Sequence, residues 1–192
     1  MTTSTLWNGT IPAGTSSVST SLRNDGLTIT VTEDCTLTEI GFFVPSTETN
    51  LDGTAYTAQL WTTTTGFTGT LVTSNPGSGT FTAGTWNFIT LASPQALTPG
   101  VTYIASVVSP DQIQFLHGYW GSGGPGAGGM SSGPIFAPGT AAAPGLSQQN
   151  NTASAAFPAP SSTQSWFGID VMVTTANAPP VSPSGLVFAS PI

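Results

Sequence analysis

Few residues of this chain are suited to acid–base or nucleophilic chemistry. His117 is the only histidine and Cys35 the only cysteine. Catalysis of hydrolysis by side chains needs a nucleophile beside a base, or two carboxyl groups held as a pair. Nothing in the sequence places His117 beside such a nucleophile. Asp34 precedes Cys35 and the chain has no lysine, so the neighbouring charge raises the pKa of the thiol. We therefore expect no enzyme activity and a small buried role for Cys35.

One segment resembles the first half of a calcium-binding loop. Glu48, Asn50 and Asp52 alternate along the chain and are followed by Gly53, which is the spacing of oxygen ligands in such loops. The twelfth position would be Gln59 instead of the bidentate glutamate. The sequence therefore favours a polar hairpin loop over a calcium site, and we expect no cofactor.

The aromatic residues divide into predicted core residues and a candidate ligand patch. Trp61, Trp86, Tyr103 and Trp166 lie in apolar, strand-like segments and are expected in the core. His117, Tyr119 and Trp120 border a glycine-rich stretch and form the candidate patch, for a sugar or for a neighbouring subunit. Side chains of adjacent strand residues point to opposite faces, so at most one of Tyr119 and Trp120 is expected in the core of a one-sided strand.

Two further residues are expected to have structural roles. Trp7 lies in the polar N-terminal segment, and we interpret it as an anchor onto a neighbouring subunit. Asp170 stands among apolar residues of the last predicted strand. Because a buried carboxylate needs partners, Asp170 is expected to accept backbone N–H groups where strands cross.

The elements that position these residues are predicted to be strands. The chain of 192 residues is rich in threonine, with 23 glycines and 16 prolines, a composition that favours strands and turns over helices. Leu27, Ile29 and Val31 alternate with threonines, after a turn signal at Asn24-Asp25-Gly26. Similar segments recur about every 8–12 residues, which is typical of a sandwich or barrel. We predict an all-β fold, an antiparallel, jelly-roll-like β-sandwich with almost no helix.

Three regions flank or interrupt this predicted sandwich. Residues 1–25 are interpreted as an N-terminal arm or edge strands, and residues 26–175 as the sandwich domain. Residues 121–162 form a Gly/Ala/Pro-rich insertion whose first part, 121–134, has no side chains with which to make a core. Residues 176–192 form a proline-rich, extended tail. Its apolar residues are expected, like Trp7, to contact neighbours in an assembly: Leu186, Val187, Phe188 and Ile192.

Charge excludes several classes of partner. The formal net charge is −7 and charged residues make up 5% of the chain, against about 25% in a typical soluble domain. Arg23 and His117 are the only basic side chains, so the chain has almost nothing with which to neutralise phosphate groups. We therefore expect it to bind neither DNA, nor RNA, nor an anionic membrane surface. No apolar run reaches the about 18 residues of a membrane span. No signal peptide is visible at Met1, although the composition is that of an extracellular surface protein. A virion protein would combine the lack of a visible signal peptide with a surface-protein composition, because it is made in the host cytoplasm and used outside the cell.

Six segments resemble an uncharacterised bacterial β-sandwich domain family. The segments are LTEIGFFV (37–44), AQLWT (58–62), GTLV (69–72), GTWNFITLASP (84–94), LTPGVTYIAS (97–106) and WFGIDVMV (166–173). The family is found on secreted and surface proteins and in virion proteins of actinobacterial phages. The resemblance implies a sandwich fold and no defined activity, and it does not extend to the insertion or to either end of the chain.

Two functions from different classes follow as expectations. The first is a non-enzymatic structural protein on the virion surface of a phage, as head decoration or as a minor tail protein. Its partners would be major capsid or tail proteins and copies of itself, with a trimer as one arrangement. The alternative is a carbohydrate-binding module that recognises cell-surface glycans. A solvent-exposed row of aromatic rings would favour the glycan module, and aromatic residues buried only in an assembly would favour the virion protein.

Overall fold

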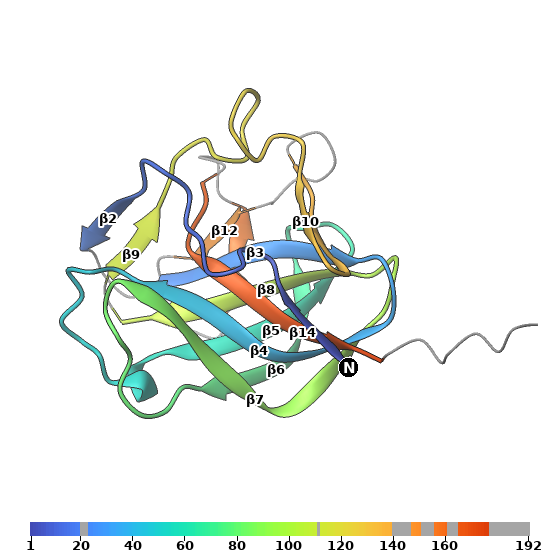
Figure 1. Cartoon of the computed structure of the whole chain (residues 1–192), viewed down its shortest axis with the longest axis horizontal. Helices are drawn as coiled ribbons and strands as arrows, with labels where there is room; N and C mark the ends of the chain where they lie inside the picture. Colours follow the sequence, from blue (N-terminus) through green and yellow to red (C-terminus); the bar gives the residue numbers. More distant parts are fainter. Residues whose placement is uncertain (20–22, 111, 140–146, 151–155, 161–164, 177–192) are drawn as a thin grey trace, which may run out of the picture.

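The fold is built from strands in which threonine alternates with apolar residues. In this computed structural model, residues 1–19, 23–110, 112–139, 147–150, 156–160 and 165–176 are described. Apart from the short 3-10 turn η1 (Gly53–Ala55), every regular element in these ranges is a strand. The strands form antiparallel sheets that pack face to face (Figure 1), which confirms the predicted all-β sandwich. Within the same ranges, no helix has the length and apolarity needed to span a membrane.

The smaller sheet has four antiparallel strands. Their order in space is β1 (Thr2–Thr5), β14 (Ile169–Thr175), β4 (Cys35–Val44) and β7 (Thr85–Leu97). The two ends of the described chain are thus joined, because Thr2 pairs with Thr175 and Thr5 with Met172. Strand β7 is 13 residues long, and its pairing with β4 shifts in register between Leu37 and Glu39.

The larger sheet has β3 near its centre. Its main path runs β10 (Met130–Ser132), β11 (Ile135–Ala137), β3 (Arg23–Val31), β8 (Thr102–Ser109), β5 (Thr57–Thr63) and β6 (Gly69–Pro76). Strand β12 (Ser147–Asn150) also pairs with β3, and β13 (Ala159–Pro160) pairs with β12. A separate pair joins β2 (Ser16–Ser19) to β9 (Gln112–Phe115).

The apolar core lies between the two main sheets. It includes Ile29 of β3, Ile40 of β4, Leu60 of β5, Ala105 of β8 and Val171 of β14, and none of these five side chains is exposed. Burial of these alternating apolar positions is the main stabilising contribution to such a fold.

The predicted turn at Asn24-Asp25-Gly26 is wrong. These three residues continue β3 and pair with Val108, Val107 and Ser106 of β8. The polar Asn24 is tolerated inside the sheet because its Nδ2 donates to Gln59 Oε1 at 2.8 Å and to the Ala156 carbonyl at 3.1 Å. Long-range pairing therefore overrides the local turn preference.

The insertion takes part in the sheet and the core, which corrects the expectation that its first part contributes no core side chains. Met130 packs against the core cluster, and Ile135 and Ala137, just beyond that part, are fully buried within it. Strand β11 pairs with β3 at Val31 and Thr30, while β12 pairs with β3 from Leu27 back to Asn24. Two pieces of the insertion thereby cover one edge of β3 that would otherwise lie open.

Candidate functional site

The carboxylate of Asp170 holds the start of the chain against β14. Its Oδ1 accepts the backbone N–H of Leu6 at 2.8 Å and that of Val171 at 2.7 Å, and its Oδ2 accepts the N–H of Trp7 at 3.4 Å. Burial raises the pKa of the Asp170 carboxyl to about 6, although these hydrogen bonds act in the opposite direction. The prediction that Asp170 accepts backbone N–H groups is confirmed.

The side chain of Trp7, whose N–H is bound by Asp170, lies in the core of its own chain. Its indole Nε1 donates to the carbonyl of Ile169 at 2.7 Å, and 3% of the residue is exposed. The interpretation of Trp7 as an anchor buried only in an assembly is therefore wrong. The hydrogen bonds from Leu6 and Trp7 to Asp170 hold the N-terminal segment against the core, so the ring is already covered in the single chain.

Trp7 is the centre of an aromatic cluster. Its ring centroid lies 5.7 Å from those of Tyr119 and Trp166 and 6.0 Å from that of Trp120. The Trp7 contacts with Tyr119 and Trp166 are edge-to-face, an arrangement that aromatic quadrupoles favour. Within the described residues, the buried indole N–H groups of Trp120 and Trp166 have no acceptor. The cluster connects the N-terminal segment, the glycine-rich loop and the start of the last strand.

The structure divides the predicted ligand patch. Tyr119 and Trp120 are both buried, and their rings contact each other edge-to-face at 4.8 Å. The expectation of opposite faces fails because β9 ends at Phe115 and Tyr119 and Trp120 lie in a turn, where strand alternation does not apply. His117 is exposed, and its Nδ1 lies 2.9 Å from Ser165 Oγ.

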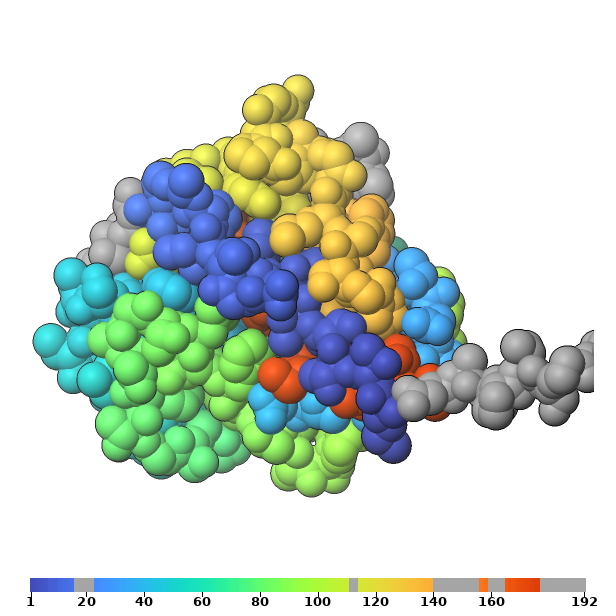
Figure 2. Space-filling model, viewed as in Figure 1, coloured from blue at the N-terminus to red at the C-terminus, as the bar shows by residue number. Residues whose placement is uncertain are grey.

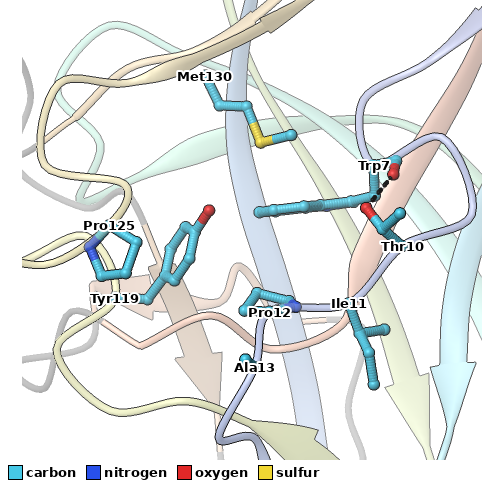
Figure 3. A pocket seen from close by; sticks show the side chains of 8 residues that line it. All are labelled: Trp7, Thr10, Ile11, Pro12, Ala13, Tyr119, Pro125 and Met130. Atoms are coloured by element: carbon cyan, nitrogen blue, oxygen red, sulfur yellow. Dashed lines mark hydrogen bonds between the residues drawn. The ribbon is translucent and has the colours of Figure 1, made fainter.

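A hollow lies beside this cluster, where the N-terminal segment faces the insertion. Figure 2 shows the two segments lying against each other on one face of the molecule. The hollow has a volume of about 340 Å³ and is lined by Trp7, Thr10, Ile11, Pro12, Ala13, Tyr119, Pro125 and Met130. In Figure 3 the Tyr119 hydroxyl points toward the space between the Trp7 ring and the Met130 thioether.

The chemistry of the hollow is apolar with one polar donor. Two proline rings, two aromatic rings and aliphatic groups line it, and the hydroxyl of Thr10 donates to the Trp7 carbonyl at 2.6 Å. Burial raises the pKa of the Tyr119 hydroxyl, so this group stays protonated at neutral pH. Among the described residues, no hydrogen-bond partner of the Tyr119 hydroxyl is found. The hollow is therefore suited to an apolar ligand that brings one hydrogen-bond acceptor.

The oxygens of the calcium-like segment are used within their own loop. Glu48 Oε1 accepts the N–H groups of Thr49 and Asn50, both at 2.7 Å. Asp52 Oδ1 accepts the N–H of Thr54 at 3.0 Å and its hydroxyl at 2.8 Å, and these bonds lower the pKa of the Asp52 carboxyl. In the part of the chain that the structure describes, no three His, Cys, Asp or Glu side chains gather as metal ligands. The loop has the geometry of a polar connection capped by its own side chains.

The other predicted site residues lie away from the hollow or outside the described ranges. Cys35 is a buried free thiol, and burial, together with the charges of Glu33 and Asp34, raises its pKa to about 11. A thiol with this pKa is a weak nucleophile at neutral pH. The predicted tail contacts lie outside the described residues: Leu186, Val187, Phe188 and Ile192.

The sequence contains one Gly-x-Ser-x-Gly motif, contrary to the expectation that it has none. Gly129-Met130-Ser131-Ser132-Gly133 has the Gly-x-Ser-x-Gly spacing of a nucleophile elbow. That elbow needs a strand, a sharp turn and a following helix. Here Ser131 instead lies within β10 and pairs with Phe136 of β11 in a hairpin. The motif thus lacks the backbone that would present a nucleophile.

Comparison with known families gives one match that covers most of the chain. A family described as a domain of unknown function (DUF4082) matches residues 10–168. The chain belongs to this family. The expectation of an uncharacterised domain family is thereby confirmed. A comparison with curated proteins finds no match.

Solved structures resemble the DUF4082 chain only at low identity. The cysteine protease and lectin-like domains of Cwp84, a surface-layer-associated protein of Clostridium difficile, align with 83% of this chain and 34% of that one, at 12% identity and a TM-score of 0.44. A structure of Cwp84 after propeptide cleavage aligns with 84% of this chain and 38% of that one, at 13% identity and a TM-score of 0.44. A structure of infectious bursal disease virus aligns with 90% of this chain and 40% of that one, at 15% identity and a TM-score of 0.26. The chain spans less than half of each matched structure, and these likenesses carry no inference about function.

The hollow is built mainly from the DUF4082 region, but it is completed from outside that region. Thr10 to Ala13, Tyr119, Pro125 and Met130 lie within residues 10–168, whereas Trp7 precedes them. Sequence reasoning identified Tyr119 and Trp7 but gave them surface roles, and it missed the remaining lining residues. The glycine-rich stretch could have indicated that these rings are covered. A glycine allows close approach of the backbone, and the backbone of Gly126 packs directly on the rings of Tyr119 and Trp120.

Proposed function

We propose that this DUF4082 chain is a non-enzymatic structural module on the surface of a virus particle. It would act in head decoration or in the tail of a phage and contact capsid or tail proteins and further copies of itself. The observation that carries the proposal is an exposed, uncharged edge of the larger sheet.

That edge is strand β6 and the loop before it. Phe67, Leu71 and Val72 are 59%, 39% and 42% exposed, and β6 is the last strand of its sheet. Open edges offer unpaired backbone groups to other chains, and proteins that stay monomeric usually protect them with lysine or other charges. Here no charged residue occurs between Asp52 and Asp111, a range that includes β5 to β8. The protective features of β6 are a bulge opposite Leu60 and Trp61 and the proline at its end, Pro76.

The absence of charge on this edge suits a permanent protein contact better than free exposure to solvent. Aliphatic and aromatic side chains gain free energy when a partner covers them, at about 25 cal/mol for each Å² removed from water. Uncharged backbone groups at a sheet edge can pair with a further strand at the same time. Both features support an assembly role.

The chemistry of the hollow supports binding over catalysis. Tyr119 is the only titratable group among its eight lining residues. Elsewhere in the described chain, the carboxylates of Glu48, Asp52 and Asp170 accept backbone N–H groups and serve as structural caps. These contacts are those of a scaffold.

The alternative, a carbohydrate-binding module, gains no support from the aromatic residues of the predicted patch. Sugar recognition by stacking needs an aromatic face open to solvent. Tyr119 and Trp120 are 8% and 1% exposed, and their rings are covered by Trp7 and by the backbone at Gly126. Of the predicted patch, only His117 remains at the surface.

The test is to locate the chain on particles. Antibodies raised against the purified full chain are applied to purified virus particles from the culture that produces it, and binding is followed by immunogold electron microscopy. Regular labelling of heads or tails is the expected result. Unlabelled particles together with labelled cell walls would overturn the proposal and return the glycan-binding module as the better function. An unrelated β-sandwich protein used as competitor controls for nonspecific binding.

A further inference from the structure

We propose that the open end of strand β6 pairs with the same strand of a second copy of the chain, which joins the larger sheets of two copies edge to edge. The open end consists of Thr70, Leu71 and Val72, together with Phe67 in the loop before the strand. This inference rests on the proposed assembly function and names the partner of one surface in that assembly.

The open end is uncovered in the single chain. Thr70, Leu71 and Val72 are all exposed, although side chains of successive strand residues point to opposite faces of a sheet. Neither face of the strand is therefore fully packed at this point. Among the described strands, β6 is the last of the larger sheet, so the outward backbone groups of the open end meet no further strand.

The chain itself covers β6 on either side of the open end. Before it, the ring of Phe157 lies so close to Gly69 that a Cβ there would overlap the ring. After it, Asn75 joins β6 to the smaller sheet, because its Oδ1 accepts the N–H of Ala92 in β7 at 2.8 Å. The Nδ2 of Asn75 donates to Thr73 Oγ1, also at 2.8 Å. The open end is therefore a short gap in a strand that is otherwise attached to its own chain.

The other end strand of the larger sheet is attached in the same way. Strand β10 lies at the opposite end of the sheet from β6 (Figure 1). The turn of its hairpin with β11 is at Gly133, whose backbone packs on the side chain of Ser4 in β1. At β6, by contrast, the apolar side chains of Phe67, Leu71 and Val72 remain exposed.

The charge distribution favours a second copy as the partner. Each copy has a formal net charge of −7, so two copies repel each other at long range. No charged residue occurs between Asp52 and Asp111, a range that includes β5 to β8, and Asp52 pairs with Thr80, beyond the Pro76 end of β6. Two β6 strands can therefore meet without bringing carboxylates of these strands together.

The open end is also complementary to itself. Two identical strands that pair antiparallel are related by a two-fold axis perpendicular to the sheet, so one residue lies opposite its own copy. With Leu71, the middle of the open end, in that position, Thr70 lies opposite Val72 of the second copy. Pairs of β-branched and aliphatic side chains of this kind stabilise neighbouring strands.

The two protective features of β6 limit this pairing without preventing it. The bulge leaves Val72 without a counterpart in β5, whereas Thr70 and Leu71 keep their register with Thr62 and Trp61. Pro76, which has no N–H to donate, lies beyond the open end. Because a two-fold contact uses the same surface on both copies, it closes as a dimer and does not continue into a fibre.

The first experiment changes the charge at Thr70 in the full chain and follows dimerisation by light scattering over a range of concentrations. The wild type should form a dimer. Thr70→Lys and Thr70→Glu should each weaken dimerisation at least about tenfold, because two like charges would face each other about 7–8 Å apart in a dry contact. An equal mixture of the two variants should regain the dimer, because opposite charges then meet.

A matched control separates this contact from the effect of net charge. Thr3 is an exposed threonine of β1, which is the end strand of the smaller sheet opposite β7. Thr3→Lys and Thr3→Glu change the net charge by the same amounts as the Thr70 variants and should leave dimerisation nearly unaltered. An effect of net charge alone would move the Lys and Glu variants in opposite directions, whereas the proposed pairing weakens both.

The second experiment needs no substitution. Hydrogen exchange of the amides of residues 70–72 in the wild type is compared at concentrations below and above dimerisation. Slower exchange in the dimer is expected, because backbone groups at the open end become paired. The exposed position of Thr70 also predicts that its variants fold, and an unchanged urea unfolding midpoint checks this.

The outcomes separate this inference from the proposed function. A monomeric wild type, a dimer that persists in both Thr70 variants, or a mixture that stays monomeric overturns the pairing of β6 with its own copy. Regular labelling of particles by antibody would still stand in that case, with β6 contacting another protein of the particle. Unlabelled particles together with a charge-dependent dimer would overturn the virion role and leave the β6 contact in place.

Discussion

At the scale of single residues, Asp170 and Gly126 have the largest consequences for the hollow. Asp170 places Trp7 by accepting the N–H groups that lead into it. Gly126 lets the glycine-rich loop lie on the rings of Tyr119 and Trp120, and its N–H donates to the Tyr119 carbonyl at 2.9 Å. Both Asp170 and Gly126 thus contribute to the packing of the aromatic cluster.

The raised pKa of Asp170 predicts how stability changes with pH. The folded chain holds this proton up to a pKa of about 6, whereas the unfolded chain releases it near 3.8. Between these values the folded state binds more protons, so this group's contribution to stability falls as pH rises from about 4 to about 6, by on the order of 2–3 kcal/mol. Urea unfolding of the wild type and of Asp170→Asn across this range measures the difference.

The control for this pH effect is Asp52. Hydrogen bonds from Thr54 lower the pKa of this exposed carboxyl, so its contribution to stability is lost as pH falls through the lowered pKa, the opposite direction. Asp52→Asn should leave the fall between pH 4 and 6 in place. If Asp170→Asn keeps the full pH dependence of the wild type, the assignment of the effect to Asp170 is wrong.

Gly126→Ala is predicted to destabilise the chain. A Cβ at this position would overlap the rings of Tyr119 and Trp120, and such overpacking costs about 1–3 kcal/mol. Gly128→Ala is the matched control in the same loop, because a Cβ there meets no atom within 4 Å. Equal midpoints of urea unfolding for the two variants would contradict the packing of the loop on the aromatic cluster.

At the scale of elements, short strands complete sheets made by longer ones. Strand β1 continues the smaller sheet beyond β14, and β11 and β12 cover the edge of β3. Each joins segments distant in the sequence, so each contributes only when the main sheets have formed. The N-terminal strand is held additionally by the ring of Trp7 at its end.

Trp7→Ala is therefore expected to destabilise the chain and release β1. Replacing a buried tryptophan by alanine costs about 3–5 kcal/mol. Hydrogen exchange of the β1 amides should also speed up in the native state, because the anchor that holds the strand is lost. Phe67→Ala, at an aromatic residue that is 59% exposed, should change the unfolding free energy by less than about 0.5 kcal/mol. A native exchange pattern in Trp7→Ala would show that β1 is held by pairing alone.

At the scale of the whole molecule, the charge-poor surface and the open β6 edge bear on association. Phe67→Lys with Val72→Lys introduces the charges that normally protect such an edge. We expect the double variant to have a lower mass in light scattering than the wild type at equal concentration, with an unchanged unfolding midpoint. Ser78→Lys adds a charge at an exposed loop residue beyond the end of β6 and should leave the mass unaltered. An unaltered mass in the double variant would exclude β6 from the contacts between copies.

How far the fold follows from the sequence depends on the range of the interactions. The alternation at Leu27, Ile29 and Val31 indicates a strand, because burial of one face is encoded in neighbouring residues. The residues Asn24-Asp25-Gly26 are typical of a turn, but they continue a strand. Their local turn preference is outweighed by the long-range pairing with β8. Asp170 was recognised because a carboxylate in an apolar strand requires donors, whichever segment provides them.

The sequence by itself determined the all-β class, the poverty of charge, the buried thiol and the need of Asp170 for partners, because each depends on composition or on residues close in the chain. Only the tertiary structure decided that Trp7, Tyr119 and Trp120 are buried together and that a hollow opens beside them. Those contacts join segments more than a hundred residues apart, and no local pattern records which distant backbone will cover a ring. The ring of Trp7 reaches Tyr119 and Trp120 because the carboxylate of Asp170, in the last strand, accepts the N–H groups of Leu6 and Trp7 and so holds the N-terminal segment against the core.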